Sequence, residues 1–362
     1  MKKLPQSLKV KNEQGNVAII VALSIVAFIS FTALSVDIGY ALVTRNQLQN
    51  VADTAALAAT RKLSHDYYEG KTFPEQQAVT VAACRSTLVT TAQQAAAANI
   101  AGGKYITSIN DSDIIIGQWH SLTKSLTPDA NPPDAVKVTA RRDASANAPI
   151  TTFFAGLFGT TQLSVTASAT AALTGQSTSV PGGLPLPAAL SRYRFSTPAC
   201  DQPIKFNPTN DITSCGGWHT YENPANANSL RNILQGLING TYTSPETIAG
   251  ITQFNFIGGD LGSAFSDMEA LFNAMKVKND GVLDLDTDSS TWTTSVPVYE
   301  GNDCSNPNQT MTIVGFATVT ITSIAGPPAK TVNGVIKCAF IEPGRGGGGD
   351  FGTKGTIPGL VQ

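Results

Sequence analysis

The sequence predicts an α+β protein in which one long N-terminal helix precedes two units built from helices and strands. Three observations lead to this prediction. Residues 17–36 form an apolar stretch without charge or proline, residues 37–63 continue at helical spacing with a polar face, and alternating apolar and polar residues then predict several strands. Helices and strands in this irregular order are typical of α+β domains.

The apolar stretch predicts a transmembrane helix, because about twenty helical residues at ~1.5 Å each span the roughly 30 Å hydrocarbon layer of a bilayer. Residues 1–16 form a basic tail, and Asp37 ends the apolar stretch. The positive-inside rule places such a tail in the cytoplasm and the bulk of the chain beyond the membrane. The alternatives are a signal peptide cleaved near Ser35, whose core is usually shorter, and a buried core helix, which seldom lacks polar residues.

The helix is predicted to continue beyond the membrane with a face of small residues that packs closely against other helices. We single out nine residues there as a helix-packing motif: Asp37, Gly39, Arg45, Leu48, Ala52, Asp53, Ala55, Ala56 and Ala59.

Four segments in this region, in the same order, resemble the N-terminal Tad domain of TadG-like and TadE-like proteins of bacterial Flp (Tad) pilus systems. These segments are residues 15–20 (GNVAII), 37–39 (DIG), 47–49 (QLQ) and 52–59 (ADTAALAA), with Arg45 between the second and the third. The resemblance implies a single-pass, inner-membrane, pilin-like component whose partners are other pilus assembly components and, along residues 17–36, membrane lipid. Processed pilins of this broad group carry glutamate five residues after the cleavage-site glycine. Here Gly15 is followed at that distance by Ile20, so we expect an unprocessed protein.

Residues 37–174 are expected to form the pilin-like α+β module. Its predicted second helix covers residues 75–99, ahead of Gly102 and Gly103, and a short helix is predicted at 152–157. Strands are predicted at 105–109, 113–119, 135–140 and 163–173.

Residues 175–190 are expected to be a linker poor in packing residues, followed by a second α+β domain at 191–343. Helices are predicted there at 228–237 and 263–275, and strands at 294–299, 310–323 and 332–340. The glycine-rich tail, residues 344–362, is expected to be mobile. The alternative is a docking peptide that adds to a partner's sheet edge.

Four of the five cysteines lie in the second domain: Cys200, Cys215, Cys304 and Cys338. Beyond the membrane we expect them to form two disulfides. Sequence alone permits three pairings. We prefer Cys200 with Cys215, on either side of a Pro- and Asn-rich loop, and Cys304 with Cys338, which flank the strand predicted at 310–323. Cys84 is expected to be a buried thiol, with an intermolecular bridge as the alternative.

Composition and motifs argue against several functions. The net charge of −2 and the scattered lysines and arginines give no basic patch for nucleic acid. No catalytic motif surrounds the three histidines, and a Cys215–His219 pair is a poor candidate if Cys215 is oxidised. We therefore expect no enzyme and no cofactor.

Calcium is the one cofactor for which the sequence offers candidate ligands. Alternating carboxylates at Asp284, Asp286 and Asp288 begin like an EF-hand loop, but Ser289 and Ser295 replace its glycine and its final acid.

The sequence thus predicts a membrane-anchored structural or accessory component of Flp/Tad pilus assembly. The alternative is an anchored surface adhesin whose second domain is the binding module.

Overall fold

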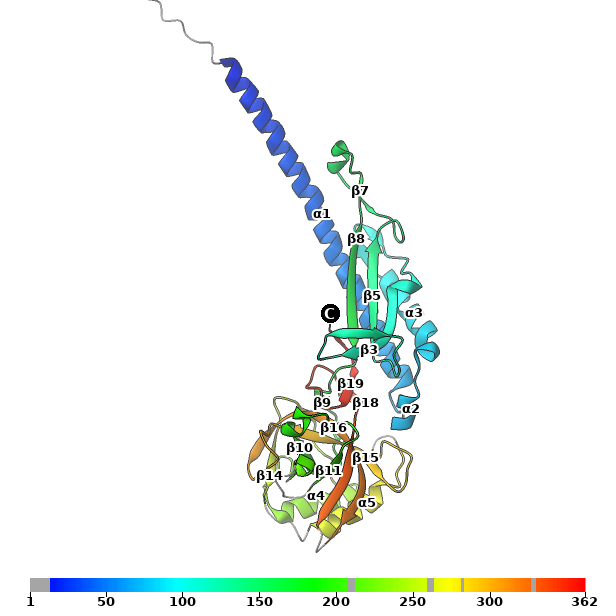
Figure 1. The fold of residues 1–362 in the computed structure, drawn as a ribbon, viewed down its shortest axis with the longest axis vertical. Coiled ribbons are helices and arrows are strands. Elements are labelled where there is room, and N and C mark those ends of the chain that lie inside the picture. Colours follow the sequence, from blue (N-terminus) through cyan, green and yellow to red (C-terminus); the bar gives the residue numbers. More distant parts are fainter. Residues whose placement is uncertain (1–13, 207–211, 259–263, 281–282, 327–329, 362) are drawn as a thin grey trace, which may run out of the picture.

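The computed structural model describes residues 14–206, 212–258, 264–280, 283–326 and 330–361. Most of the basic N-terminal tail lies outside the described residues. The molecule is elongated: a long helix leads from the N-terminal end into a sheet module, and a rounded second domain lies at the far end (Figure 1). The predicted α+β class is confirmed.

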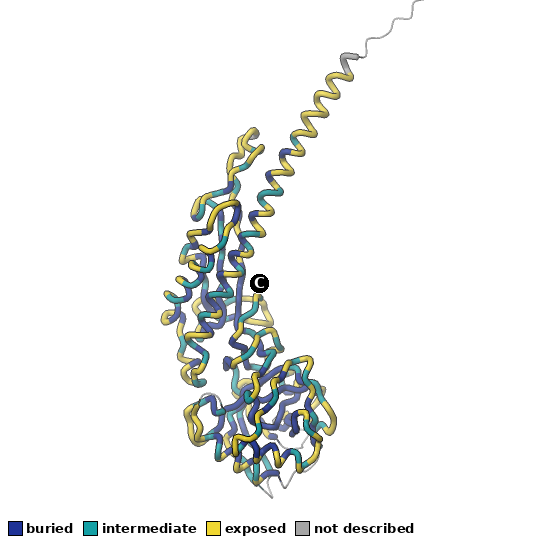
Figure 2. The backbone as a smooth tube through the Cα atoms, turned by 180° about the vertical axis from the view of Figure 1, so that it is seen from behind, coloured by how far each residue is buried: buried dark blue, intermediate teal, exposed yellow. Residues whose placement is uncertain are grey.

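The first helix, α1 (Gln14–Tyr67), runs unbroken through the apolar stretch and the amphipathic stretch that follows it. At 1.5 Å per residue its 54 residues extend about 80 Å. Its first half is exposed along nearly its whole surface, whereas one face of its second half is buried (Figure 2). The predicted continuation of the helix beyond the apolar stretch is confirmed.

The helical hairpin of the N-terminal module (residues 37–174) has an extra break. The single helix expected at 75–99 is two helices, α2 (Phe73–Gln77) and α3 (Val81–Ala97). Thr80 adopts an extended conformation before α3, and its hydroxyl oxygen accepts a hydrogen bond from the Ala83 N–H. A polar N-cap of this kind starts a new helix, which the alanine-rich composition concealed.

Helices α1 and α3 cover one face of a five-stranded antiparallel sheet, ordered β20-β8-β5-β3-β4. Inward residues of neighbouring strands lie directly opposite one another, as Val138 and Ala169 do, and pack on α1 and α3. The strands are β3 (Ile114–His120), β4 (Ser125–Pro128), β5 (Ala135–Arg142), β8 (Val165–Ala172) and β20 (Gly359–Leu360). Short pieces complete the module: β1 (Ile100–Ala101), β2 (Lys104–Tyr105), η1 (Asp111–Asp113), β6 (Ile150–Thr151), η2 (Ala155–Phe158) and β7 (Gln162–Leu163).

The second domain is built around a closed ring of five strands, β16-β14-β12-β10-β15, because the long strand β16 pairs with both β14 and β15. Two further strands, β17 and β11, extend the sheet from β16. The strands are β10 (Ala188–Ser191), β11 (Pro203–Lys205), β12 (Gly216–His219), β14 (Gln253–Ile257), β15 (Trp292–Tyr299), β16 (Thr310–Ala325) and β17 (Thr331–Lys337). The helical elements are η3 (Arg192–Ser196), η4 (Ile212–Ser214), α4 (Ala227–Asn239) and α5 (Phe265–Met275).

Two segments expected to lack packing are in fact ordered. Leu184 and Leu186, in the expected linker, are fully buried in the core of the second domain. The glycine-rich tail forms β19 (Thr353–Ile357), which pairs with β18 (Phe340–Arg345), and then β20 on the module's sheet. The linker contributes β9 (Thr178–Ser179), which pairs with β13 (Thr247–Ile248). The expectation of a mobile tail is therefore wrong.

The tail's glycines allow close approach of two backbones rather than mobility. A Cβ atom on Gly348 would collide with the backbone of Gln176, and one on Gly175 with the backbone of Gly349. This contact is hydrogen-bonded, since the Gly348 N–H donates to the Gly175 carbonyl at 2.8 Å. Composition alone does not distinguish this use of glycine from a flexible linker.

The two disulfides join Cys200 to Cys338 and Cys215 to Cys304, so the preferred pairing is wrong. Antiparallel β11 and β17 place Pro203 opposite Val335, and continuing that register brings Cys200 opposite Cys338. Around the second bridge, the Ser191 N–H donates to the Cys215 carbonyl and its hydroxyl to the Asp303 carbonyl. Pairing is set by strand neighbours far apart in sequence, which distance along the chain does not predict. Cys84 is a buried free thiol.

Candidate functional site: the N-terminal helix and its collar

The apolar half of α1 is a candidate membrane span. It begins at Val17, carries no charged residue before Asp37, and is almost entirely exposed. The core helix of a soluble domain buries such a surface, whereas lipid accommodates it without any protein partner. The apolar half of α1 is exposed, and one face of its second half is buried in the module. The candidate functional site therefore lies along α1.

The small-residue face of α1 packs against the chain's own module. Leu48, Ala52, Ala55, Ala56 and Ala59 are fully buried in the module core, where alanine lets β8 and α3 approach α1 closely. The residues thought to pack on a neighbouring helix are therefore covered within this chain.

The other motif residues lie around that face. Arg45 is exposed and forms no ion pair among the described residues, and Asp53 accepts a hydrogen bond from Gln49 Nε2 at 2.8 Å. Nothing lies within 4 Å of the position a Cβ would take on Gly39.

Asp37 attaches a loop of the module to α1 at the end of the apolar stretch. Its carboxylate accepts three backbone hydrogen bonds, from Phe153 at 2.7 Å, Phe154 at 3.0 Å and Ala155 at 2.6 Å. Burial alone raises the pKa of Asp37, but these three N–H donors outweigh that effect and hold the pKa below its usual value. Asp37 is therefore kept ionised although it is buried.

Two further side chains of α1 extend this attachment into a collar, which we define as Asp37, Tyr40 and Gln47. The Tyr40 hydroxyl donates to the Gly102 carbonyl at 3.0 Å, and the Gly102 N–H donates to Gln47 Oε1 at 2.8 Å. The Tyr40 ring also packs edge to face with Phe153, with 5.5 Å between the ring centroids. The sequence singled out Asp37 and, within the segment 47–49, Gln47. It missed Tyr40 and the role of Gln47 because the partners of both side chains lie in a distant loop.

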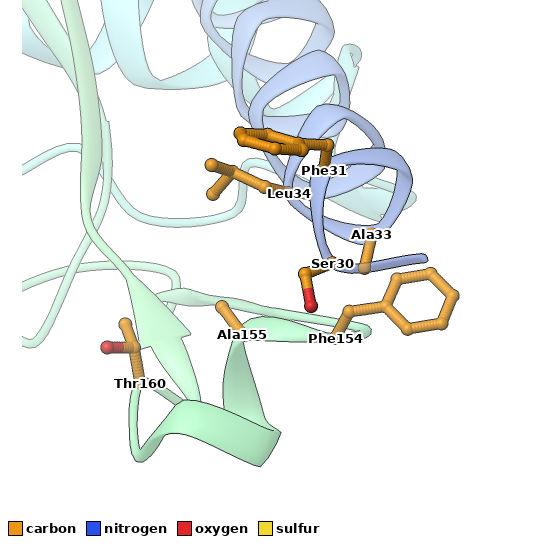
Figure 3. Close-up of a pocket in the computed structure, with 7 residues that line it drawn as sticks. All are labelled: Ser30, Phe31, Ala33, Leu34, Phe154, Ala155 and Thr160. Atoms are coloured by element: carbon orange, nitrogen blue, oxygen red, sulfur yellow. The ribbon is translucent and has the colours of Figure 1, made fainter. Parts of the chain in front are cut away.

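An apolar groove separates the apolar half of α1 from the collar loop, which we define as residues 152–161. It holds about 360 Å³ and is lined by Ser30, Phe31, Ala33, Leu34, Phe154, Ala155 and Thr160 (Figure 3). The collar loop thus lies level with the last turns of the apolar stretch.

The candidate calcium ligands do not form a metal site in the part of the chain that the structure describes, where no group of three or more His, Cys, Asp or Glu is placed to hold an ion. Their oxygens serve the loop itself: Asp288 accepts from the Ser290 N–H at 2.9 Å, and Asp284 accepts from the Thr293 N–H at 3.2 Å. Burial raises the pKa of Asp284 to about 6.

The histidines lie apart from one another and from the collar. His219 is fully buried beside Phe254, and burial lowers its pKa to about 3. Cys215, its possible partner, is oxidised in a disulfide and has no thiolate. His65 is exposed next to Asp66, and His120 contacts the Thr127 hydroxyl.

A long helix with an exposed apolar start, whose second half packs on an antiparallel sheet, defines a pilin-like protein. Two family models match parts of the chain: residues 15–62 match the model described as putative Flp pilus-assembly TadE/G-like, and residues 74–171 match the one described as putative Tad-like Flp pilus-assembly. Residues 15–62 and 74–171 are therefore similar to the two regions of Tad-type pilus-assembly proteins that these models describe. No curated protein and no solved structure matched the chain.

Proposed function

We propose that this chain is a membrane-anchored structural or accessory component of Flp/Tad pilus assembly. The observation that carries the proposal is the division of α1 into an exposed apolar half and a half packed into a Tad-type module. Such a helix holds a folded module at a fixed place on a membrane. Other assembly components are the proposed partners.

The proposed topology has the N-terminus in the cytoplasm, α1 across the inner membrane and the two folded units on the far side. Lys2, Lys3, Lys9 and Lys11 precede the apolar stretch against the single acid Glu13, which supports this orientation. The two disulfides of the second domain support it too, because disulfides persist in oxidising compartments.

The proposed role is structural and not catalytic. We propose that the module (residues 37–174) and the second domain (residues 191–343) act as one unit, held together by the tail (residues 344–362). Support comes from Lys354 of the tail, which forms an ion pair with Asp134 of the module, and from Thr353 of the tail, whose hydroxyl lies 2.8 Å from that of Thr318 in the second domain.

Reporter fusions test the topology. Alkaline phosphatase, which is active only outside the cytoplasm, is fused after Gln362 or before Met1, and the two fusions serve as controls for each other. Activity of the C-terminal fusion alone agrees with the proposal. Activity of the N-terminal fusion alone contradicts it.

Deletion of the gene tests the role. Loss of surface pili, restored by the full chain, supports assembly. Normal pili with poor attachment would instead favour the adhesin, in which the second domain binds a surface ligand.

A further inference from the structure

We propose that the collar loop is a second membrane contact, which inserts its apolar tip into the outer leaflet beside α1. This inference rests on the proposed membrane anchoring of α1 and adds a site to it. The occupant of the groove in Figure 3 is then lipid.

The surface of the loop fits an apolar environment. Phe153 is 65% exposed and Leu157 is 82% exposed, and Phe154 between them is 40% exposed. No Asp, Glu, Lys or Arg occurs between Asp143 and Arg192. In water such a tip leaves large apolar side chains without partners, whereas lipid removes them from water.

The level of the loop along α1 agrees with the depth to which interfacial segments enter a bilayer. The groove places Phe154, Ala155 and Thr160 beside residues 30–34 of α1, which precede Asp37 by three to seven residues. At ~1.5 Å per helical residue this is roughly 5 to 10 Å into the apolar stretch. That distance matches the depth at which interfacial apolar segments insert.

Most backbone N–H groups of the loop find hydrogen-bond acceptors within the protein, as N–H groups must in a lipid environment without water. Asp37 accepts from three N–H groups, and the N–H groups of Thr152, Leu157, Gly159 and Thr160 donate to carbonyls within the loop. The Thr152 hydroxyl donates to the Thr160 carbonyl at 2.7 Å. A surface loop in water has no need for so many internal partners, because water supplies them.

Lipid is the favoured occupant because the groove is continuous with the exposed apolar surface of α1. The face of α1 that the module covers is filled by its own core, and the groove opens on the uncovered apolar half. Tyr40 and Phe153 lie at the junction, where aromatic side chains are enriched at membrane interfaces.

A fluorescence experiment on the full chain tests the inference. Leu157→Cys carries an NBD label, in a Cys84→Ala background that leaves one reactive thiol. Leu122→Cys is the matched control, since Leu122 is a 99% exposed leucine in the β3–β4 turn of the same module. Both proteins are reconstituted into phosphatidylethanolamine and phosphatidylglycerol vesicles with nitroxide-labelled lipids.

We expect the label at position 157 to emit at shorter wavelength than in water. Nitroxides placed near the headgroup should quench most of this fluorescence. The label at position 122 should show neither effect. Vesicle-bound protein whose label at 157 emits as in water overturns the inference and leaves the anchoring intact. Blue-shifted emission that no lipid nitroxide quenches also overturns it, because protein then covers the loop. Failure of the unlabelled chain to float with vesicles contradicts the anchoring itself.

Discussion

The side-chain amide of Gln76 makes two hydrogen bonds to the backbone of Ile341, and so joins α2 of the N-terminal module to β18. Gln76 Nε2 donates to the Ile341 carbonyl at 2.9 Å, and the Ile341 N–H donates to Gln76 Oε1 at 2.9 Å. Gln76 is buried, and Phe73 stacks on Phe340 beside it. The amide of Gln76 thus pairs with the N–H and the carbonyl of Ile341, as the backbone of a neighbouring strand would.

Gln76→Ala is expected to destabilise the junction by about 1 to 3 kcal/mol, because it leaves the buried N–H of Ile341 without an acceptor. Chemical denaturation of the purified chain measures this change. Gln77→Ala is the matched control, since Gln77 is an exposed neighbour, and it is expected to change stability little. Equal effects of the two substitutions would show that Gln76 contributes no more than a surface residue.

Lys354→Met is expected to destabilise the module by roughly 3 to 5 kcal/mol, because it leaves the buried Asp134 carboxylate unpaired. Adding Asp134→Asn to Lys354→Met is expected to recover much of that loss, since the asparagine oxygen can still accept from the Trp119 N–H. Thermal unfolding of the two single variants and the double variant gives the coupling free energy. Additive losses would mean that the ion pair does not attach the tail.

Glu342 is expected to make the protein less stable as pH rises. It is buried on β18, and burial raises its pKa from 4.5 to about 8. Between those values the unfolded chain has released a proton that the folded chain retains, so the free energy of unfolding falls with increasing pH by a few kcal/mol in all.

Glu342→Gln is therefore expected to flatten the decline between pH 4.5 and 8 and to raise stability most near pH 8. Urea unfolding at a series of pH values measures this. The exposed Glu300→Gln serves as the control. An unchanged pH profile in Glu342→Gln would mean that this carboxyl ionises at its ordinary pH.

Asp37→Asn is expected to loosen the collar loop, because the amide has one acceptor oxygen and no charge for the three backbone donors of residues 153–155. Hydrogen exchange of those amides should accelerate. Asp53→Asn, on the same helix, is the control. In the parent chain the low pKa of Asp37 keeps the loop attached above pH 3.8, and attachment is lost only as pH falls below that value. Unchanged exchange in Asp37→Asn would show that packing alone holds the loop.

Patterns local in sequence predicted several long elements, but the strand expected at 105–109 is wrong, since only Lys104–Tyr105 pairs there as β2. The apolar run before Asp37 and the alternation in residues 135–140 and 163–173 were enough to predict α1, β5 and β8. Strands β10, β11, β12 and β14 were missed because each has only three to five residues, so that any alternation of apolar and polar residues in them is brief. Three of them, β10, β12 and β14, belong to the closed ring. The sequence around each strand does not show which other strands it pairs with.

The remaining differences concern contacts between distant segments. The disulfide pairing depends on the β11–β17 register, and the tail's order depends on glycines facing residues 175 and 176. At the candidate site, Asp37 was singled out by its place after the apolar run, but its partners Phe153 to Ala155 lie in another loop. The spacing of residues along α1 does not indicate which distant N–H groups donate to Asp37.

Strand β20 pairs Gly359 with Ala172 and Leu360 with Ala171, so the last residues of the chain complete the sheet begun by its first third. A polypeptide that emerges N-terminus first must therefore wait until residues 359–360 are made before that sheet has its fifth strand. Any chain cut short by early termination leaves the edge of β8 open to pairing with foreign strands. The pairing of Gly359 and Leu360 thus protects the edge of β8 from such contacts.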